Sequence, residues 1–179
     1  MLSNKKIKID QKKGICIWIT GLAGSGKTAI AKKIRSRFAK LYGPTILVSG
    51  DDIRNIFGLY KFTKEERQKN AINFGKFSKF VINQKINIIL ATIGMFEKAR
   101  KNNRKNIKNY IEVYIKADIK TIIKIGKKKI YKRFNRNIVG LDIKPELPEN
   151  PDIIIKNDFN TSVEKLSDKL IKSLKKKLK

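Results

Sequence analysis

A glycine-rich octapeptide between two structured segments constrains this chain more than any other feature. Residues 21–28 read Gly-Leu-Ala-Gly-Ser-Gly-Lys-Thr and satisfy the pattern G-x-x-x-x-G-K-[ST] in full. An apolar run at residues 14–20 precedes them and predicts a buried strand, and a helical pattern at residues 27–41 follows. A phosphate-binding loop requires this context, so we interpret the octapeptide as such a loop and not as a chance glycine-rich turn.

The residue types in this loop suit it to the phosphates of ATP. Glycines let successive backbone N–H groups converge on the β and γ phosphates at the positive end of the following helix. Lys27 adds a mobile positive charge, and the Thr28 hydroxyl is a suitable ligand for Mg²⁺. We predict ATP and Mg²⁺ as cofactors. The predicted ATP-binding residues are Gly21, Leu22, Ala23, Gly24, Ser25, Gly26, Lys27 and Thr28.

Apolar runs and helical patterns alternate along the rest of the chain. Further strands are predicted at residues 45–49, 86–92, 110–115 and 152–155. Helices are predicted at residues 64–84, 96–103, 119–125 and 162–178, with Asp118 and Thr161 as caps of the last two. Because parallel strands need crossover connections, we predict an α/β, three-layer P-loop kinase fold with a mainly parallel five-stranded sheet.

The 179 residues suit one domain spanning residues 1–179, with one long irregular segment inside it. Residues 126–150 combine a lysine run with three prolines, Pro145, Pro148 and the adjoining Pro151. We interpret this segment as a mobile lid over the active site, in which Lys128, Tyr131 and Arg133 are candidate contacts. An ordinary surface loop with a solvated basic face is the alternative.

Acidic and basic residues follow the second predicted strand, at the end of the sheet where ligands bind in open α/β folds. Asp51 is our candidate for accepting the proton of an attacking hydroxyl, for holding water on Mg²⁺, or for both. Helix capping is the alternative for Asp51 and Asp52. Arg54 and Arg67 suit bidentate contacts with an anionic acceptor, or are solvated surface residues.

The formal net charge of +28 predicts an anionic partner. The lysines are spread over the chain, with no RNA-recognition signature, so we expect a small nucleotide substrate and no nucleic acid. Binding of nucleic acid stays open as an alternative with steep salt dependence. Cys16 lies in an apolar run and is predicted to be a buried, inert thiol. The absence of a signal peptide or membrane span predicts a soluble, cytoplasmic protein.

Several blocks, in order from Ile17 to Asp158, resemble the adenylylsulfate kinase family. The loop GLAGSGKT resembles that family's GLSGAGKST, and SGDDIR at residues 49–54 resembles DGDNIR. FTKEERQKN at residues 62–70 is similar to F-S-x-x-D-R-x-E-N, and YIEVY at residues 110–114 to F-x-E-V-Y. GLDIKPELPENPD at residues 140–152 resembles G-I-D-x-P-Y-E-x-P-x-N-P-D.

This resemblance implies a kinase that transfers the γ-phosphoryl group of ATP to the 3′-hydroxyl of a nucleotide, and it implies a homodimer. We assign catalysis to Asp51 and Lys27, and metal binding to Thr28 and Asp51. Phe62 would stack on the acceptor base, a buried core position being its alternative. The predicted acceptor-binding residues are Asp51, Arg54, Phe62, Arg67, Asn70, Ile93 and Lys128.

The family pattern fails in three places. Ser49 replaces the first Asp of D-G-D, and Thr-Ile-Gly-Met-Phe-Glu at residues 92–97 replaces F-I-S-P-Y-R. In the lid, the nucleotide-stacking Arg is missing, while Lys128 and Tyr131 keep their places. The altered segments resemble relatives of surface polysaccharide synthesis, including cytidine diphosphoramidate kinase. Both acceptors therefore stay open, as does a nucleotide-binding regulator that has lost transfer.

Overall fold

The computed structural model describes residues 7–126 and 137–178. Its five strands form one sheet in the order β2-β3-β1-β4-β5, and every neighbouring pair is parallel. The strands are β1 (Cys16–Thr20), β2 (Thr45–Ser49), β3 (Asn87–Ala91), β4 (Tyr110–Lys116) and β5 (Ile153–Lys156). The predicted α/β fold is confirmed, and each predicted strand boundary falls within two residues of the observed one.

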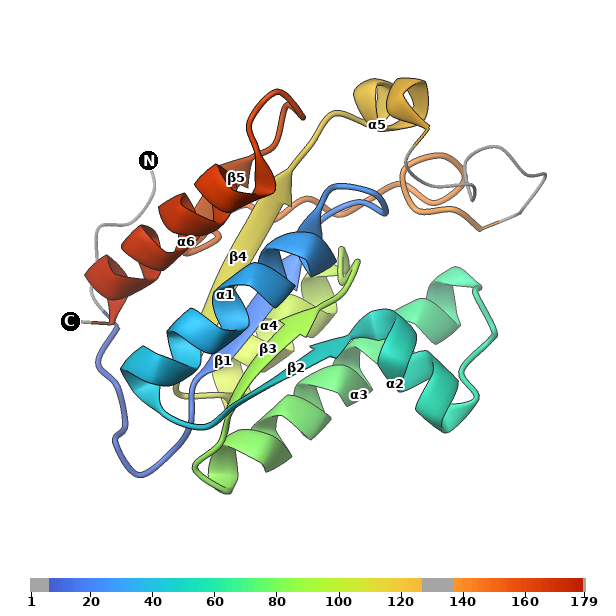
Figure 1. Cartoon of the computed structure of the whole chain (residues 1–179). Coiled ribbons are helices and arrows are strands. Elements are labelled where there is room, and N and C mark those ends of the chain that lie inside the picture. The colour runs from blue at the N-terminus through green and yellow to red at the C-terminus, as the bar shows by residue number, and fades with distance from the viewer. Residues whose placement is uncertain (1–6, 127–136, 179) are drawn as a thin grey trace.

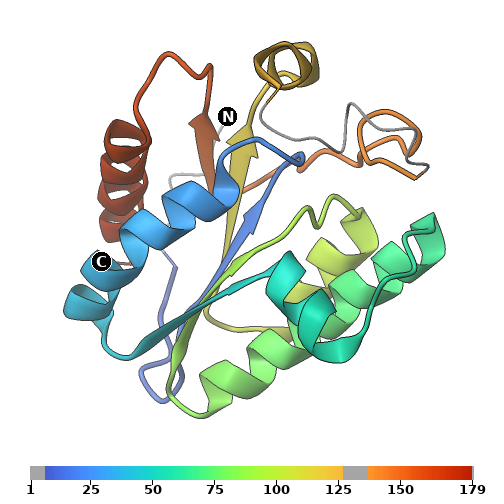
Figure 2. The same ribbon diagram turned by 45° about the vertical axis from the view of Figure 1, so that its right-hand side comes forward.

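Helices cover both faces of this sheet (Figures 1 and 2). They are α1 (Lys27–Tyr42), α2 (Gly50–Phe57), α3 (Lys64–Asn83), α4 (Glu97–Asn106), α5 (Ile119–Ile125) and α6 (Val163–Lys177). Helices α1 and α6 pack on one face, whereas α2 and α3 pack on the other, with α4 beside α3. No helix of the described ranges is both long and apolar enough to cross a membrane.

Strand β1 shows how the sequence pattern builds the two cores. Side chains alternate across a strand, so Ile17 and Ile19 enter the core under α1 and α6, while Cys16 and Trp18 enter the core under α3. All four side chains are fully buried. The predicted burial of the Cys16 thiol is confirmed, and burial raises its pKa to about 12.

The predicted N-cap is correct for α5 and wrong for α6. Asp118 caps α5 by accepting a hydrogen bond from the Thr121 backbone N–H at 2.8 Å. Helix α6 is capped by Ser162, not by Thr161. The Thr161 N–H instead donates to Asp158 at 3.2 Å, which places Thr161 in the turn before the helix.

The described part of the predicted lid, residues 137–150, is not a featureless loop. Ile138, Val139 and Ile143 are buried, and a bridge joins Val139 to Ile143. Val139 and Ile143 pack in one apolar cluster with Leu22 of the glycine-rich loop and Tyr114 of β4. The lid is therefore anchored at this end. The predicted lid contacts Lys128, Tyr131 and Arg133 lie outside the described residues.

Candidate active site

The glycine-rich loop connects the end of β1 directly to the start of α1. Gly26, the N-cap of α1, has a left-handed backbone with φ of 95°. A Cβ at this position would come within 2.8 Å of the Asn157 amide nitrogen, which itself donates to the Ser25 carbonyl at 3.0 Å. Glycine is required here, and Asn157 fixes the loop from the end of β5.

The Lys27 side chain folds back onto the glycine-rich loop. Its ammonium donates to the Leu22 carbonyl at 2.6 Å and lies 3.4 Å from the Ser25 hydroxyl. Lys27 is buried, whereas Thr28, one position further along α1, is exposed. Among the described side chains none caps the N-terminus of α1. The positive end of the α1 dipole, with the Lys27 ammonium, gives the loop the character of an anion site.

The two neighbouring aspartates after β2 have different environments. Ser49 and Asp52 form a reciprocal capping box at the start of α2, with hydrogen bonds of 2.7 and 3.2 Å. The capping alternative is thus confirmed for Asp52. Asp51 takes no part in the box; its side chain is 70% exposed and forms an ion pair with Arg54.

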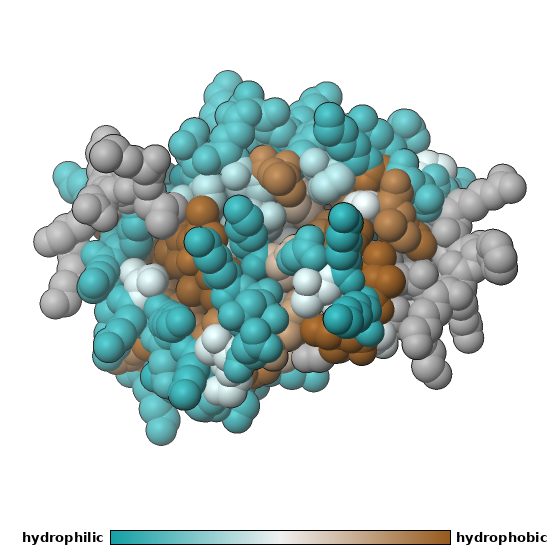
Figure 3. Space-filling model, turned by 90° about the horizontal axis from the view of Figure 1, so that it is seen from above, coloured by the Kyte–Doolittle hydropathy of each residue, from teal (hydrophilic) through white to brown (hydrophobic). Residues whose placement is uncertain are grey.

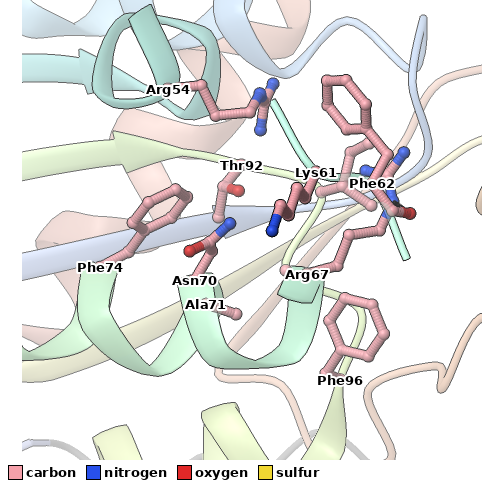
Figure 4. A pocket seen from close by; sticks show the side chains of 11 residues that line it. Arg54, Lys61, Phe62, Arg67, Asn70, Ala71, Phe74, Thr92 and Phe96 are labelled. Carbon is pink, nitrogen blue, oxygen red and sulfur yellow. Dashed lines mark hydrogen bonds between the residues drawn. The ribbon is translucent and has the colours of Figure 1, made fainter. Parts of the chain in front are cut away.

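A pocket beside this helix contains most of the predicted acceptor-binding residues (Figure 4). It lies between α2, α3 and the loop that follows β3. Its lining consists of Arg54, Lys61, Phe62, Arg67, Asn70, Ala71, Phe74, Thr92, Ile93, Gly94 and Phe96. Of the predicted set, Arg54, Phe62, Arg67, Asn70 and Ile93 meet here, while Lys128 lies outside the described residues.

Phe62 presents an aromatic face at this pocket. Phe62 is 40% exposed, so the alternative of a buried core position is wrong. The guanidinium carbons of Arg67 and Arg54 lie 4.9 and 6.0 Å from the ring centroid. Such an arrangement of an aromatic ring with cations suits a planar, anionic ligand.

A second pocket joins the acceptor pocket to the phosphate-binding loop. Its lining includes Ala23, Gly24 and Lys27 from the loop, together with Gly50 and Asp51 from the start of α2. It shares Arg54, Phe62, Arg67, Thr92 and Ile93 with the acceptor pocket. Asp51 and Lys27 therefore line one pocket that shares five residues with the first pocket.

Arg67 connects this pocket to Asn137, in the predicted lid segment. Its guanidinium donates to the Phe62 carbonyl at 2.9 Å and to the Asn137 carbonyl at 3.0 Å. Burial, followed by the nearby charge of Arg54, lowers the pKa of the Arg67 guanidinium. An anionic acceptor would relieve this repulsion between the two arginines.

Several residues of this pocket were not predicted from the sequence. Ala71 and Phe74 lie on α3 four and seven positions after Arg67, so helical periodicity from Arg67 and Asn70 would have found them. Gly94 and Phe96 belong to the segment that departs from the family pattern. Lys61 carried no signal beyond its place next to Phe62.

The residues present fit a Mg²⁺ ion held mainly by the nucleotide. The described residues contain no group of three or more His, Cys, Asp or Glu side chains that would cage a metal. Mg²⁺ in phosphoryl-transfer sites uses one or two protein oxygens together with phosphates and water. The exposed Thr28 hydroxyl and the Asp51 carboxylate supply such oxygens.

Known proteins match almost the whole chain. It is 38% identical over 162 residues to cytidine diphosphoramidate kinase of Campylobacter jejuni, which covers 88% of this chain and 95% of that one. It is 33% identical over 176 residues to adenylyl-sulfate kinase of Thermodesulfovibrio yellowstonii, with coverages of 93% and 86%.

A solved structure matches the fold. The Mycobacterium tuberculosis APS kinase CysC, in complex with AMPPNP and APS, superposes with a TM-score of 0.80 at 21% identity. The match covers 91% of this chain and 98% of that one. The family profile described as adenylylsulphate kinase covers residues 13–156. With the glycine-rich loop and the adjoining pocket in place, the chain belongs to the adenylylsulphate kinase family and is an ATP-dependent kinase.

Proposed function

We propose that this kinase transfers the γ-phosphoryl group of ATP to the 3′-hydroxyl of a cytidine diphosphoramidate-like nucleotide. One observation carries the choice of acceptor. The segment that departs from the adenylylsulfate kinase pattern supplies Thr92, Ile93, Gly94 and Phe96 to the wall of the acceptor pocket. A change in this wall alters what the pocket recognises, while the phosphate-binding loop keeps its full motif. The 38% identity to the Campylobacter jejuni kinase supports the same choice.

Adenylylsulfate is the second candidate acceptor. The family profile and the relatives at 31% to 33% identity that carry that activity in their names favour it. Both acceptors combine a planar base with an anionic group. Phe62, flanked by Arg54 and Arg67, supplies complementary chemistry for either one.

In the proposed mechanism, Asp51 accepts the proton of the acceptor hydroxyl. The hydroxyl oxygen forms a bond to the γ-phosphorus, the bond from that phosphorus to the β–γ bridging oxygen breaks, and ADP leaves. The Lys27 ammonium and the N–H groups of the loop stabilise charge on the phosphate oxygens. Mg²⁺, held by Thr28 and Asp51 in this proposal, would neutralise further charge on those oxygens.

Acceptor choice is tested by supplying adenylylsulfate and cytidine diphosphoramidate separately with ATP and Mg²⁺. We expect a higher kcat/KM with the cytidine compound and a product that carries one added phosphate on the 3′-oxygen. Product mass and phosphorus NMR identify that product. A higher kcat/KM with adenylylsulfate would assign the chain to sulfate activation instead.

We further propose a cytoplasmic location and a homodimer. Membership of a family of ATP-dependent kinases supports the location, and the resemblance to that family supports the dimer. Light scattering tests the assembly: twice the mass of one chain is expected, and the mass of a single chain would contradict it.

A further inference from the structure

The loop at residues 92–96 forms one wall of the acceptor pocket, and its support comes from elsewhere in the chain. From the sheet side, the Thr92 N–H donates to the Ile19 carbonyl at 3.0 Å, and the Ile93 carbonyl accepts the Thr20 hydroxyl. Gly94 has φ of 47°, and a Cβ there would come within 3.0 Å of the Trp18 indole nitrogen. The loop thus rests closely on the end of β1.

The other side of the loop is held by a buried arginine of α4. Arg100 is 4% exposed, and its guanidinium donates to the Gly94 carbonyl at 3.3 Å and to the Leu147 carbonyl at 3.2 Å. The same guanidinium lies 3.3 Å from the buried carboxylate of Glu112 on β4. One side chain therefore joins the pocket wall, the anchored end of the lid and the sheet.

Glu146 makes a second connection between the lid and this loop. Its carboxylate accepts a hydrogen bond from the Glu97 N–H at 2.6 Å, and its own N–H donates to the Met95 carbonyl at 3.1 Å. The N-cap position of α4, Phe96, has no side-chain cap of its own among the described residues. Glu146 therefore stabilises the helix start that directly follows the pocket wall.

Because Arg100 ties the pocket wall at Gly94 to Leu147 and to the sheet at Glu112, we propose that it is a positioning residue for acceptor recognition. With Glu146 it couples the lid segment around residues 146–147 to the loop at residues 92–96. The inference rests on the proposed acceptor site and deepens it. Arg100 contacts Gly94, Leu147 and Glu112, none of which belongs to the phosphate-binding loop. The Gly21 N–H of that loop reaches the wall at the Ile93 carbonyl, at 3.4 Å, one residue before the Arg100 contact. Loss of Arg100 should therefore affect the acceptor much more than ATP.

Arg104 provides a matched control on the same helix. It also contacts the Glu112 carboxylate, at 3.1 Å, together with Asp152 at 3.2 Å and the Asn150 carbonyl at 3.5 Å. Its guanidinium carbon lies 5.5 Å from the centroid of the Tyr110 ring. Arg100→Met and Arg104→Met each remove one cation from the same buried carboxylate. Only the first removes hydrogen bonds to the pocket wall.

The test measures KM for acceptor and for ATP in both variants, with the acceptor that the parent uses. We expect Arg100→Met to raise acceptor KM or lower kcat/KM for it by about 10- to 100-fold, with ATP KM unchanged. Arg104→Met should leave both KM values near those of the parent. Equal effects of the two variants, or a parallel rise of both KM values in Arg100→Met, would overturn the proposal.

Two further measurements distinguish the positioning role from a folding defect and from a wrong choice of acceptor. Glu146→Ala, compared with Glu149→Ala, should raise acceptor KM without a large loss of stability. Hydrogen exchange of the amides at residues 93–97 should accelerate in Arg100→Met and not in Arg104→Met. If the parent used neither acceptor, the proposed function would fail while exchange still tested the positioning role; unchanged exchange would refute that role.

Discussion

At the residue scale, the adjacent aspartates Asp51 and Asp52 have different roles. Asp52 forms the capping box, whereas Asp51 lines the pocket that also contains Lys27. The sequence made Asp51 the catalytic candidate and left capping open for both residues. The structure assigns capping to Asp52, because the residue at the third helical position reaches back to the Ser49 N–H.

Replacement of Asp51 by Asn should separate catalysis from ATP binding. Asn keeps the size of the side chain but accepts no proton at neutral pH, so kcat should fall by roughly 10²- to 10⁴-fold. The dissociation constant of ATP, measured by titration calorimetry, should stay close to that of the parent. An equal loss of ATP binding and turnover would contradict a role for Asp51 in transfer.

Replacement of Phe62 by Ala should weaken the acceptor only. Stacking of a base on an aromatic side chain contributes about 1–3 kcal/mol, so acceptor KM should rise by roughly 5- to 150-fold. Phe80→Ala is the control, since Phe80 is an exposed phenylalanine of α3 outside both pocket linings. Similar kinetics in the two variants would argue against stacking at Phe62.

At the element scale, the capping box should make the start of α2 sensitive to acid. The hydrogen bond from the Ser49 backbone N–H lowers the pKa of the Asp52 carboxyl below 3.8. Its stabilising contribution is therefore present above the unfolded value and is lost as pH falls through the lowered folded value.

Asp52→Ala should accordingly cost about 1 kcal/mol at neutral pH. In a chain of this size that corresponds to a fall in Tm of about 2–4 °C. The Tm difference from the parent should shrink once the pH is below the folded-state pKa of Asp52. A difference that is independent of pH would show that the ionised carboxylate contributes nothing to the cap.

The sequence predicted elements well where the signal is local. β-Branched apolar runs located all five strands, and the glycine-rich motif located the start of α1 at Lys27. Thr161 was predicted as the N-cap of α6 in place of its neighbour Ser162. Both residues carry a hydroxyl that can cap a helix, and only the turn at Asp158 distinguishes them. Phe62 could not be assigned to core or pocket, since exposure depends on how α2 and α3 pack.

The Arg100 contacts could not be predicted for a similar reason. Its partners Gly94, Glu112 and Leu147 lie up to 47 residues away in the chain. No short motif encodes such a junction. The burial of Val139 and Ile143 was equally hidden, because the prolines and lysines around them suggested an irregular surface segment.

At the scale of the whole molecule, the lysines and arginines behind the net charge of +28 are spread along the chain and are not concentrated in one nucleic-acid-binding element. On the face seen from above, hydrophobic patches lie among hydrophilic side chains (Figure 3). We expect weak binding of duplex or single-stranded nucleic acid at low salt, independent of ATP and lost by about 0.15 M. Fluorescence anisotropy over a salt series checks this; tight binding at about 0.15 M would reopen the nucleic-acid alternative.

The central claim is that the joined pockets carry a phosphoryl group from ATP to a nucleotide acceptor. The most direct measurement is ADP formation with Mg²⁺, in the presence and absence of cytidine diphosphoramidate and of adenylylsulfate. We predict acceptor-dependent ADP formation, with one 3′-phosphorylated product for each ADP. ADP released equally without acceptor, or no ADP with either acceptor, would contradict the account.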